Sequence, residues 1–186
     1  MTPVPEAASA LVLVDLQHDF WPDDVAATSP ALPTSVSALL ARARAAQMMV
    51  VHVRARFQAD GSDWMHRYRL RGWIPCIEGT PGAETLPFAH ELAGEPVVVK
   101  HSFDGFLGTD LHQILTSRGV TTLYIAGLVT STCVLFTAST ATQLGYMVSV
   151  VADCCSDRHD AHHTTLAGYR FVFDTVMSDD IDVTCD

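Results

Sequence analysis

The sequence has few positive charges and no run of them. Eleven lysine and arginine residues stand against 21 aspartate and glutamate residues, which gives a formal net charge of −10 at pH 7. Binding to nucleic acid requires clustered positive charge that meets the phosphates, and binding to an anionic membrane surface requires the same. We therefore expect neither nucleic acid nor a membrane among the partners of this chain.

Long apolar runs, a targeting pattern and paired cysteines are also missing. No apolar stretch approaches the roughly 18–20 residues that a transmembrane helix needs. The first 20 residues contain no lysine or arginine, and the apolar stretch that starts at Ala10 ends at Asp15, which is unlike a secretory signal peptide. The five cysteines form no CxxC pair. Free thiols in a reducing compartment are therefore expected, and we predict a cytoplasmic protein.

The composition that remains is typical of a folded globular protein. Hydrophobic residues make up 48% of the chain and charged residues 17%, which excludes a disordered chain. A length of 186 residues suits one domain with a substantial core better than two. We therefore expect residues 1–186 to form a single domain.

Short apolar runs alternate with helical patterns along the chain. Strands are predicted at 10–15, 48–53, 96–100, 121–127, 146–153 and 169–176, and their continuous apolar character indicates cover on both faces. Helices are predicted at about 34–47, 109–118, 131–144 and 159–168. This alternation predicts an α/β fold with one parallel sheet between helix layers. The stretch 54–95 has little periodicity and is interpreted as a long functional loop.

Three reactive side chains follow the ends of predicted strands. Asp15 ends the first strand, Lys100 ends the third, and Cys133 lies just past the fourth. Ligands of open α/β sheets bind at this edge. Each residue alone has an ordinary explanation: a turn aspartate, a solvated lysine, or a cysteine that packs in the core. Their shared position at one edge favours a reactive site.

The place of Cys133 at the start of a predicted helix suggests a nucleophile. Helix N-termini carry partial positive charge and unpaired N–H groups, which lower the pKa of a thiol. The same N–H groups can stabilise the oxyanion that forms when sulfur attacks a carbonyl. Asp15 could accept the thiol proton, and Lys100 could keep Asp15 ionised.

Four sequence blocks in a fixed order carry a family resemblance. They are VDLQHDF (14–20), EGTPGAE (78–84), VVVKHSFDGFLGTDL (97–111) and IAGLVTSTCV (125–134). On these blocks the chain resembles the isochorismatase-like cysteine hydrolases from about residue 10 to residue 176. The resemblance implies a three-layer α-β-α sandwich around a six-stranded parallel sheet of order 3-2-1-4-5-6.

The resemblance also assigns roles to residues of this chain. The Asp, Lys and Cys of the family correspond to Asp15, Lys100 and Cys133. The implied strand order places Lys100 two strands from Asp15, so its side chain has to reach over the second strand. A cis peptide bond is implied between Leu128 and Val129. The N–H groups of Val129 and Cys133 would then form an oxyanion hole.

Within this superfamily, the cysteine favours an amidohydrolase. Isochorismatases proper cleave a vinyl ether and typically lack the cysteine, so Cys133 indicates hydrolysis of a C–N bond through a thioester. Nicotinamidases hold a metal with an Asp-x-His motif, which VHVRARF (51–57) lacks, and with a histidine where this chain has Pro75. We therefore expect no metal and no cofactor. A nicotinamidase and a catalytically silent interaction protein of the same fold remain alternatives.

The partner is expected to be a small-molecule substrate in an aromatic pocket. Phe20 matches a pocket position of the family, and Trp64, Trp73 and Phe103 are further candidates, although core packing explains any one of them equally well. Five arginines in or beside the long loop either recognise a substrate carboxylate or contact another subunit; they are Arg54, Arg56, Arg67, Arg69 and Arg71. Similar proteins are homo-oligomers, so a dimer or tetramer is expected.

A histidine-rich segment offers a weaker alternative site. His159, His162 and His163 have the spacing of one helix face, which suits a metal site. We favour a solvated first helical turn instead, because no carboxylate or cysteine partner is fixed nearby in sequence.

Overall fold

One six-stranded sheet organises the chain, whose residues 8–182 are described by the computed structural model. Its strands are β1 (Ala8–Val14), β2 (Met49–Ala55), β3 (Val97–Lys100), β4 (Val120–Leu128), β5 (Met147–Ser156) and β6 (Asp174–Val176). All neighbouring strands pair in parallel, in the order β3-β2-β1-β4-β5-β6. The predicted sheet and its order are therefore confirmed.

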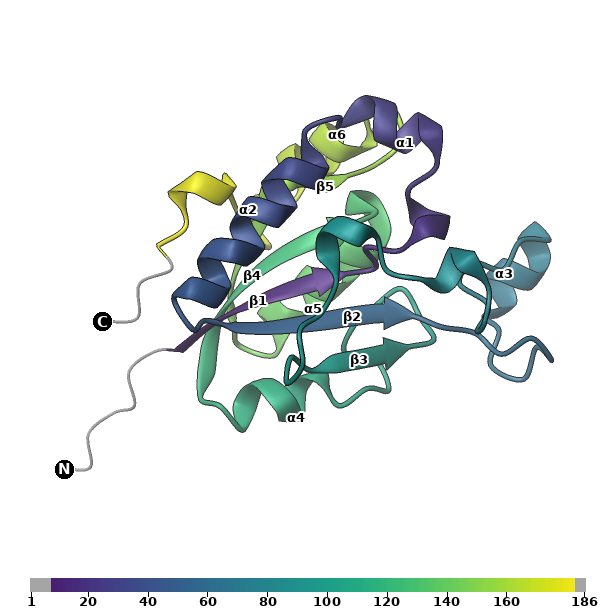
Figure 1. The fold of residues 1–186 in the computed structure, drawn as a ribbon, viewed down its shortest axis with the longest axis horizontal. Coiled ribbons are helices and arrows are strands. Elements are labelled where there is room, and N and C mark those ends of the chain that lie inside the picture. The colour runs from purple at the N-terminus through teal and green to yellow at the C-terminus, as the bar shows by residue number, and fades with distance from the viewer. Residues whose placement is uncertain (1–7, 183–186) are drawn as a thin grey trace.

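Helices flank this sheet on both sides (Figure 1). They are α1 (Asp23–Thr28), α2 (Leu32–Ala45), α3 (His66–Arg71), α4 (Leu111–Thr116), α5 (Leu135–Gln143) and α6 (Ala161–Gly168). The chain steps from β1 to β2 in one direction and from β4 to β5 in the other. Right-handed crossovers therefore place α2 and α5 on opposite faces. Among the described residues, no helix is long and apolar enough to cross a membrane.

The structure differs from the sequence predictions at three places. The last strand comprises only Asp174–Val176. The N–H groups of Val172 and Phe173 donate to the carbonyl of Tyr169, so these residues form a turn instead. The helix α1 was not predicted. The stretch 54–95 is not entirely loop, since it contains α3 and two 3₁₀ turns, each with a proline in its first turn. Proline is well tolerated there because the missing N–H would be unpaired in any case.

The centre of the sheet is tightly packed where β1 and β4 meet. The residues from Ala10 to Val14 are at most 2% exposed, as expected for a strand covered on both faces. A β-carbon at Gly127 would lie 1.9 Å from the carbonyl oxygen of Val14, and the φ angle of Gly127 is +137°. Only glycine fits this position. The close approach fixes the end of β1 beside the end of β4, where the candidate site lies.

Candidate active site

Asp15, Lys100 and Cys133 meet at the carboxyl edge of the sheet. The Nζ atom of Lys100 lies 2.7 Å from Oδ2 of Asp15 and 3.5 Å from Sγ of Cys133. The relative exposure of the three residues is 0%, 1% and 2%, respectively. The structure thus brings together the three reactive residues that the sequence placed at this edge.

Asp15 is held in place by the backbone of β2. Its φ angle of 50° is unusual for a residue other than glycine, and such conformations gather at functional sites. The Asp15 N–H donates to the carbonyl of Val53 (2.9 Å), and its Oδ1 accepts the Ala55 N–H (2.8 Å). Ala55 pairs with Lys100 in the sheet. Asp15 and Lys100 therefore both contact the end of β2, Asp15 through hydrogen bonds and Lys100 through strand pairing.

Lys100 is the only lysine of the chain, and it is buried. Its ammonium also donates to the carbonyl of Ser102 at 2.7 Å. Burial would lower the pKa of Lys100, but the Asp15 carboxylate, the Cys133 sulfur and their hydrogen bonds raise it above the ordinary lysine value. Lys100 therefore remains a cation at neutral pH and supplies positive charge to both neighbours.

Cys133 lies in one π-helical turn, Thr130–Val134, which leads from β4 into α5. Such turns are rare and are frequent at functional sites. The Ser131 N–H donates to Oδ2 of Asp157 at 2.7 Å, and the Thr130 hydroxyl donates to the carbonyl of Ser156 at 3.1 Å. The turn is thus tied to the end of β5. The peptide bond between Leu128 and Val129, just before the turn, is cis.

The lowered thiol pKa expected from a helix start is wrong. Burial raises the pKa of Cys133, the Lys100 ammonium lowers it and the nearby Asp15 charge raises it, with a net value of about 12. The prediction overlooked burial, and it assumed an α-helical start where the structure has a π-helical turn. The thiol is therefore protonated at neutral pH, so reaction at this sulfur requires a base.

A cavity of about 140 Å³ lies beside Cys133. Phe20, Trp73 and Phe103 line it, whereas Trp64 does not. Trp64 instead donates its indole N–H to the carbonyl of Gln58 (2.6 Å) and lies 5.2 Å from the Arg69 guanidinium.

Tyr68 of α3 also lines the cavity, and sequence reasoning missed it. Its ring makes edge-on contacts with Trp73 and Phe103 at centroid distances of 6.3 and 5.6 Å. Burial, followed by the nearby negative charges, raises the pKa of its phenol above the ordinary value. An aromatic residue between arginines was the only signal in the sequence.

None of the five loop arginines lines this cavity. Arg54 pairs with Glu91, Arg56 lies 3.5 Å from Glu78, and Arg69 donates to the carbonyl of Gly61. The arginine that does line the cavity is Arg158, which follows β5. The structure therefore does not support binding of a substrate carboxylate by the loop arginines at this cavity.

Two residues of the histidine-rich segment, His162 and His163, make contacts in the structure. Nδ1 of His162 lies 2.8 Å from the Thr130 hydroxyl, next to the turn that carries Cys133. The rings of His162 and His163 contact each other at 4.9 Å. Within residues 8–182, no group of three or more histidine, cysteine or carboxylate side chains could hold a metal ion.

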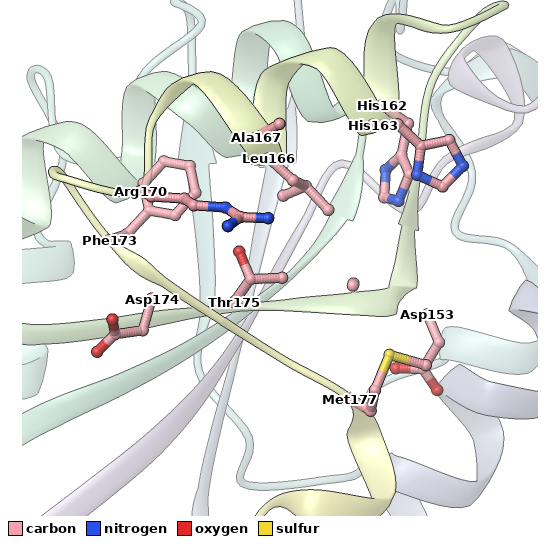
Figure 2. Close-up of a pocket in the computed structure, with 11 residues that line it drawn as sticks. Asp153, His162, His163, Leu166, Ala167, Arg170, Phe173, Asp174, Thr175 and Met177 are labelled. Carbon is pink, nitrogen blue, oxygen red and sulfur yellow. The ribbon is translucent and has the colours of Figure 1, made fainter.

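A larger cavity of about 820 Å³ lies elsewhere, along α6, β5 and β6. Figure 2 shows His162, His163, Arg170 and Asp153 around it. Asp153 is engaged by Ser178, whose N–H and hydroxyl both donate to its carboxylate. None of the three clustered reactive residues lines this cavity, whereas Cys133 lines the smaller one.

Comparisons with known proteins agree with this fold. The sequence pattern of the isochorismatase domain matches residues 9–180. A maleamate amidohydrolase of Pseudomonas putida is 32% identical over 165 residues, which are 84% of this chain and 76% of that protein. The crystal structure of an isochorismatase family protein from Desulfovibrio vulgaris has a TM-score of 0.85 at 34% identity, over 93% of this chain and 95% of that one. For N-carbamoylsarcosine amidase from Thermoplasma acidophilum the TM-score is 0.82 at 26% identity, over 94% and 97%.

Proposed function

The chain belongs to the isochorismatase domain family, and from that premise we propose that it is a cysteine hydrolase that cleaves the C–N bond of a small amide or ureido compound. The amidohydrolase and amidase among its relatives support a hydrolase that acts on amides. The observation that carries the proposal is the contact of Lys100 with both Asp15 and Cys133 beside a cavity.

In the proposed first half-reaction, Asp15 accepts the proton of the Cys133 thiol as the sulfur attacks the substrate carbonyl carbon. The raised pKa of Cys133 supports proton transfer during the attack rather than before it. A C–S bond forms and the carbonyl oxygen becomes an oxyanion. The N–H groups of Val129 and Cys133 are the proposed donors to this oxyanion. Lys100 balances the negative charge that moves between Asp15 and the sulfur.

Collapse of this intermediate breaks the C–N bond, and Asp15 returns its proton to the leaving nitrogen. Ammonia or an amine leaves, and a thioester remains on Cys133. Asp15 then takes a proton from water, the oxygen attacks the thioester, and the C–S bond breaks. The proton returns to the sulfur, so the balance is amide plus water to acid plus amine.

The proposed substrate site is the small cavity with its aromatic walls. Phe20, Trp73 and Phe103, together with Tyr68, offer flat faces on which a planar amide or ureido group can lie. A volume of about 140 Å³ holds only a few heavy atoms. We therefore propose a small metabolite rather than a peptide as the substrate.

Ammonia release tests this proposal. Purified protein is assayed with nicotinamide, biuret, ureido acids, maleamate and simple amides, next to Cys133→Ala and Asp15→Asn. We expect one compound class to be hydrolysed and both variants to lose at least about 10²-fold in kcat/KM. Cys155→Ala is the matched control, because Cys155 is a buried thiol that does not line the cavity, and it should stay active.

Other outcomes of the same assay would favour the two alternative functions, a nicotinamidase or a catalytically silent interaction protein. Turnover of nicotinamide that depends on added metal supports the nicotinamidase. No turnover of any compound in the panel supports the silent interaction protein. Full activity of Cys133→Ala contradicts the proposal itself.

We further propose that the chain acts in the cytoplasm as a single domain that forms a homo-oligomer. Large exposed apolar side chains support an interface between copies. Phe171 is fully exposed, and Met147 is 70% exposed. Light scattering at micromolar concentration is expected to give a dimer or tetramer, and a monomer contradicts this.

A further inference from the structure

Tyr68 is a buried tyrosine in the wall of the cavity beside Cys133. It belongs to α3, which lies beyond the carboxyl ends of β2 and β3 (Figure 1). Its relative exposure is 9%. Within residues 8–182, its hydroxyl group has no hydrogen-bond partner. Buried polar groups normally have such a partner, so an unpaired hydroxyl in a cavity wall is a candidate contact for a ligand.

The hydroxyl oxygen of Tyr68 reaches open space. In the described part of the chain, two side-chain polar atoms have neither a hydrogen bond nor accessible surface, namely Oδ2 of Asp15 and Oγ1 of Thr85. The Tyr68 oxygen is not one of them, so part of its surface is accessible. The charges of Cys133 and Asp15 raise the pKa of the phenol, which indicates that its hydroxyl end faces the reactive residues. The open space at that end is the cavity.

Three aromatic neighbours hold the ring of Tyr68 in this orientation. The ring meets those of Phe57, Trp73 and Phe103 edge-on, at centroid distances of 5.4, 6.3 and 5.6 Å. Edge-on contacts at such distances are favourable for aromatic pairs. The hydroxyl is therefore already in place before a ligand arrives, so a hydrogen bond to it costs little conformational entropy.

A neutral phenol suits an uncharged partner. The pKa of Tyr68 is raised above the ordinary tyrosine value, mainly by burial, so the hydroxyl stays protonated at neutral pH and can donate. It forms no hydrogen bond with Cys133 or Asp15, so it lies outside the proton path of the proposed reaction. It therefore meets a part of the substrate other than the scissile group. The carbonyl oxygen of a second amide or ureido group is an uncharged acceptor of this kind.

We propose that the Tyr68 hydroxyl donates a hydrogen bond to a second carbonyl group of the substrate, so that the protein selects small diamides and ureido compounds over simple alkyl amides. The cavity of about 140 Å³ leaves room for only a short link between the two carbonyl groups. This inference rests on the proposed amide hydrolysis and narrows its substrate class. Tyr68 is then a specificity residue, whereas Asp15, Lys100 and Cys133 carry the bond cleavage.

Binding to the Cys133→Ala variant of the full chain tests the inference without turnover. Biuret, malonamide and succinamide carry the second carbonyl group. Isovaleramide has as many heavy atoms as biuret and malonamide, and 4-methylpentanamide has as many as succinamide, but both end in a branched alkyl group. Isothermal titration calorimetry gives the Kd of each compound. We expect at least one dicarbonyl compound to bind more tightly than its alkyl match.

Second-site variants then identify the residue responsible. Adding Tyr68→Phe to Cys133→Ala removes only the hydroxyl and keeps the ring contacts, and it should reduce the preference about 5-fold or more, the effect of one neutral hydrogen bond. Tyr146→Phe is the matched control. The Tyr146 hydroxyl lies 2.9 Å from Nδ1 of His112, and this residue does not line the cavity, so its loss should not alter the preference.

Steady-state kinetics of Tyr68→Phe alone, with Cys133 intact, separates recognition from a merely structural role. We expect kcat/KM to fall for the dicarbonyl compounds and to change little for the alkyl amides, at an unchanged melting temperature. An equal fall for both members of a pair contradicts the inference, because the hydroxyl would then act on the fold or on the scissile group.

The inference is overturned if no probe binds, if no pair shows the preference, or if Tyr68→Phe leaves the preference in place. These outcomes differ from failure of the proposed function. Binding that depends on the Tyr68 hydroxyl, without ammonia release from any amide, retains the carbonyl site and contradicts the hydrolase. Hydrolysis of amides with the same preference in wild-type protein and Tyr68→Phe retains the hydrolase and contradicts the carbonyl site.

Discussion

Replacing Lys100 by methionine removes the cation that lies against the buried carboxylate of Asp15. The Nζ–Oδ2 distance is 2.7 Å, and both side chains are at most 1% exposed. With an effective dielectric constant of about 20, Coulomb's law gives an attraction of about 6 kcal/mol at this distance. Much of this attraction offsets the cost of burying the two charges. Loss of one partner from a buried pair typically costs 3–5 kcal/mol, and we expect Lys100→Met to lower the free energy of unfolding by about that amount.

Urea unfolding at pH 7.5, followed by circular dichroism, measures this loss. The double variant Asp15→Asn/Lys100→Met removes both charges, so it should be at least about 2 kcal/mol more stable than the sum of the two single effects predicts. Arg118→Met is the control, because Arg118 is exposed and its loss should cost less than about 0.5 kcal/mol. A loss below about 1 kcal/mol for Lys100→Met, or additive effects in the double variant, refutes the reasoning.

The remaining predictions concern packing, pH and metal. Gly127→Ala should prevent folding or lower the free energy of unfolding by several kcal/mol, because the new methyl group would clash with the Val14 carbonyl. Gly168 has open space around it, so Gly168→Ala should change the melting temperature little. Burial raises the pKa of Cys133 and Cys155 to about 12, whereas thiols of the unfolded chain ionise near pH 8.5. The unfolded state therefore loses these protons first, so the urea midpoint should fall as the pH rises from about 8 toward 10.5, and Cys155→Ala should lessen that fall. The proposed cysteine chemistry needs no metal, so EDTA should leave ammonia release unchanged; loss of activity that zinc or iron restores contradicts this.

The sheet was predictable from the sequence because its strands are continuous apolar runs. The segment at 121–127 is β4 to within one residue at each end, and the run at 48–53 is β2 with a shift of one to two residues. Asp15 and Lys100 could be placed at strand ends for the same reason. Their contact needs the lateral order of β3, β2 and β1, which periodicity does not contain and which came from the family resemblance.

The site details that were missed depend on tertiary packing. The helix α3 (HRYRLR) has no helical spacing of apolar residues, and Tyr68 is buried only because Phe57, Trp73 and Phe103 surround it. The raised pKa of Cys133 likewise follows from burial, which its position in the sequence does not reveal. Arg158 lines the cavity, but it stands alone after a strand, so the sequence does not single it out. The arginines of the long loop form a conspicuous cluster in the sequence, yet they pair with carboxylates away from the cavity.

In the proposed mechanism, the sulfur of Cys133 forms a covalent bond with the substrate acyl group. Acid quench during turnover of the best amide in the panel, followed by mass spectrometry of the intact protein and its peptides, detects this bond. We expect a mass increase equal to the acyl group on the peptide that contains Cys133, absent from Cys133→Ala. Undiminished ammonia release by Cys133→Ala, or an acyl group found only on another residue, contradicts it.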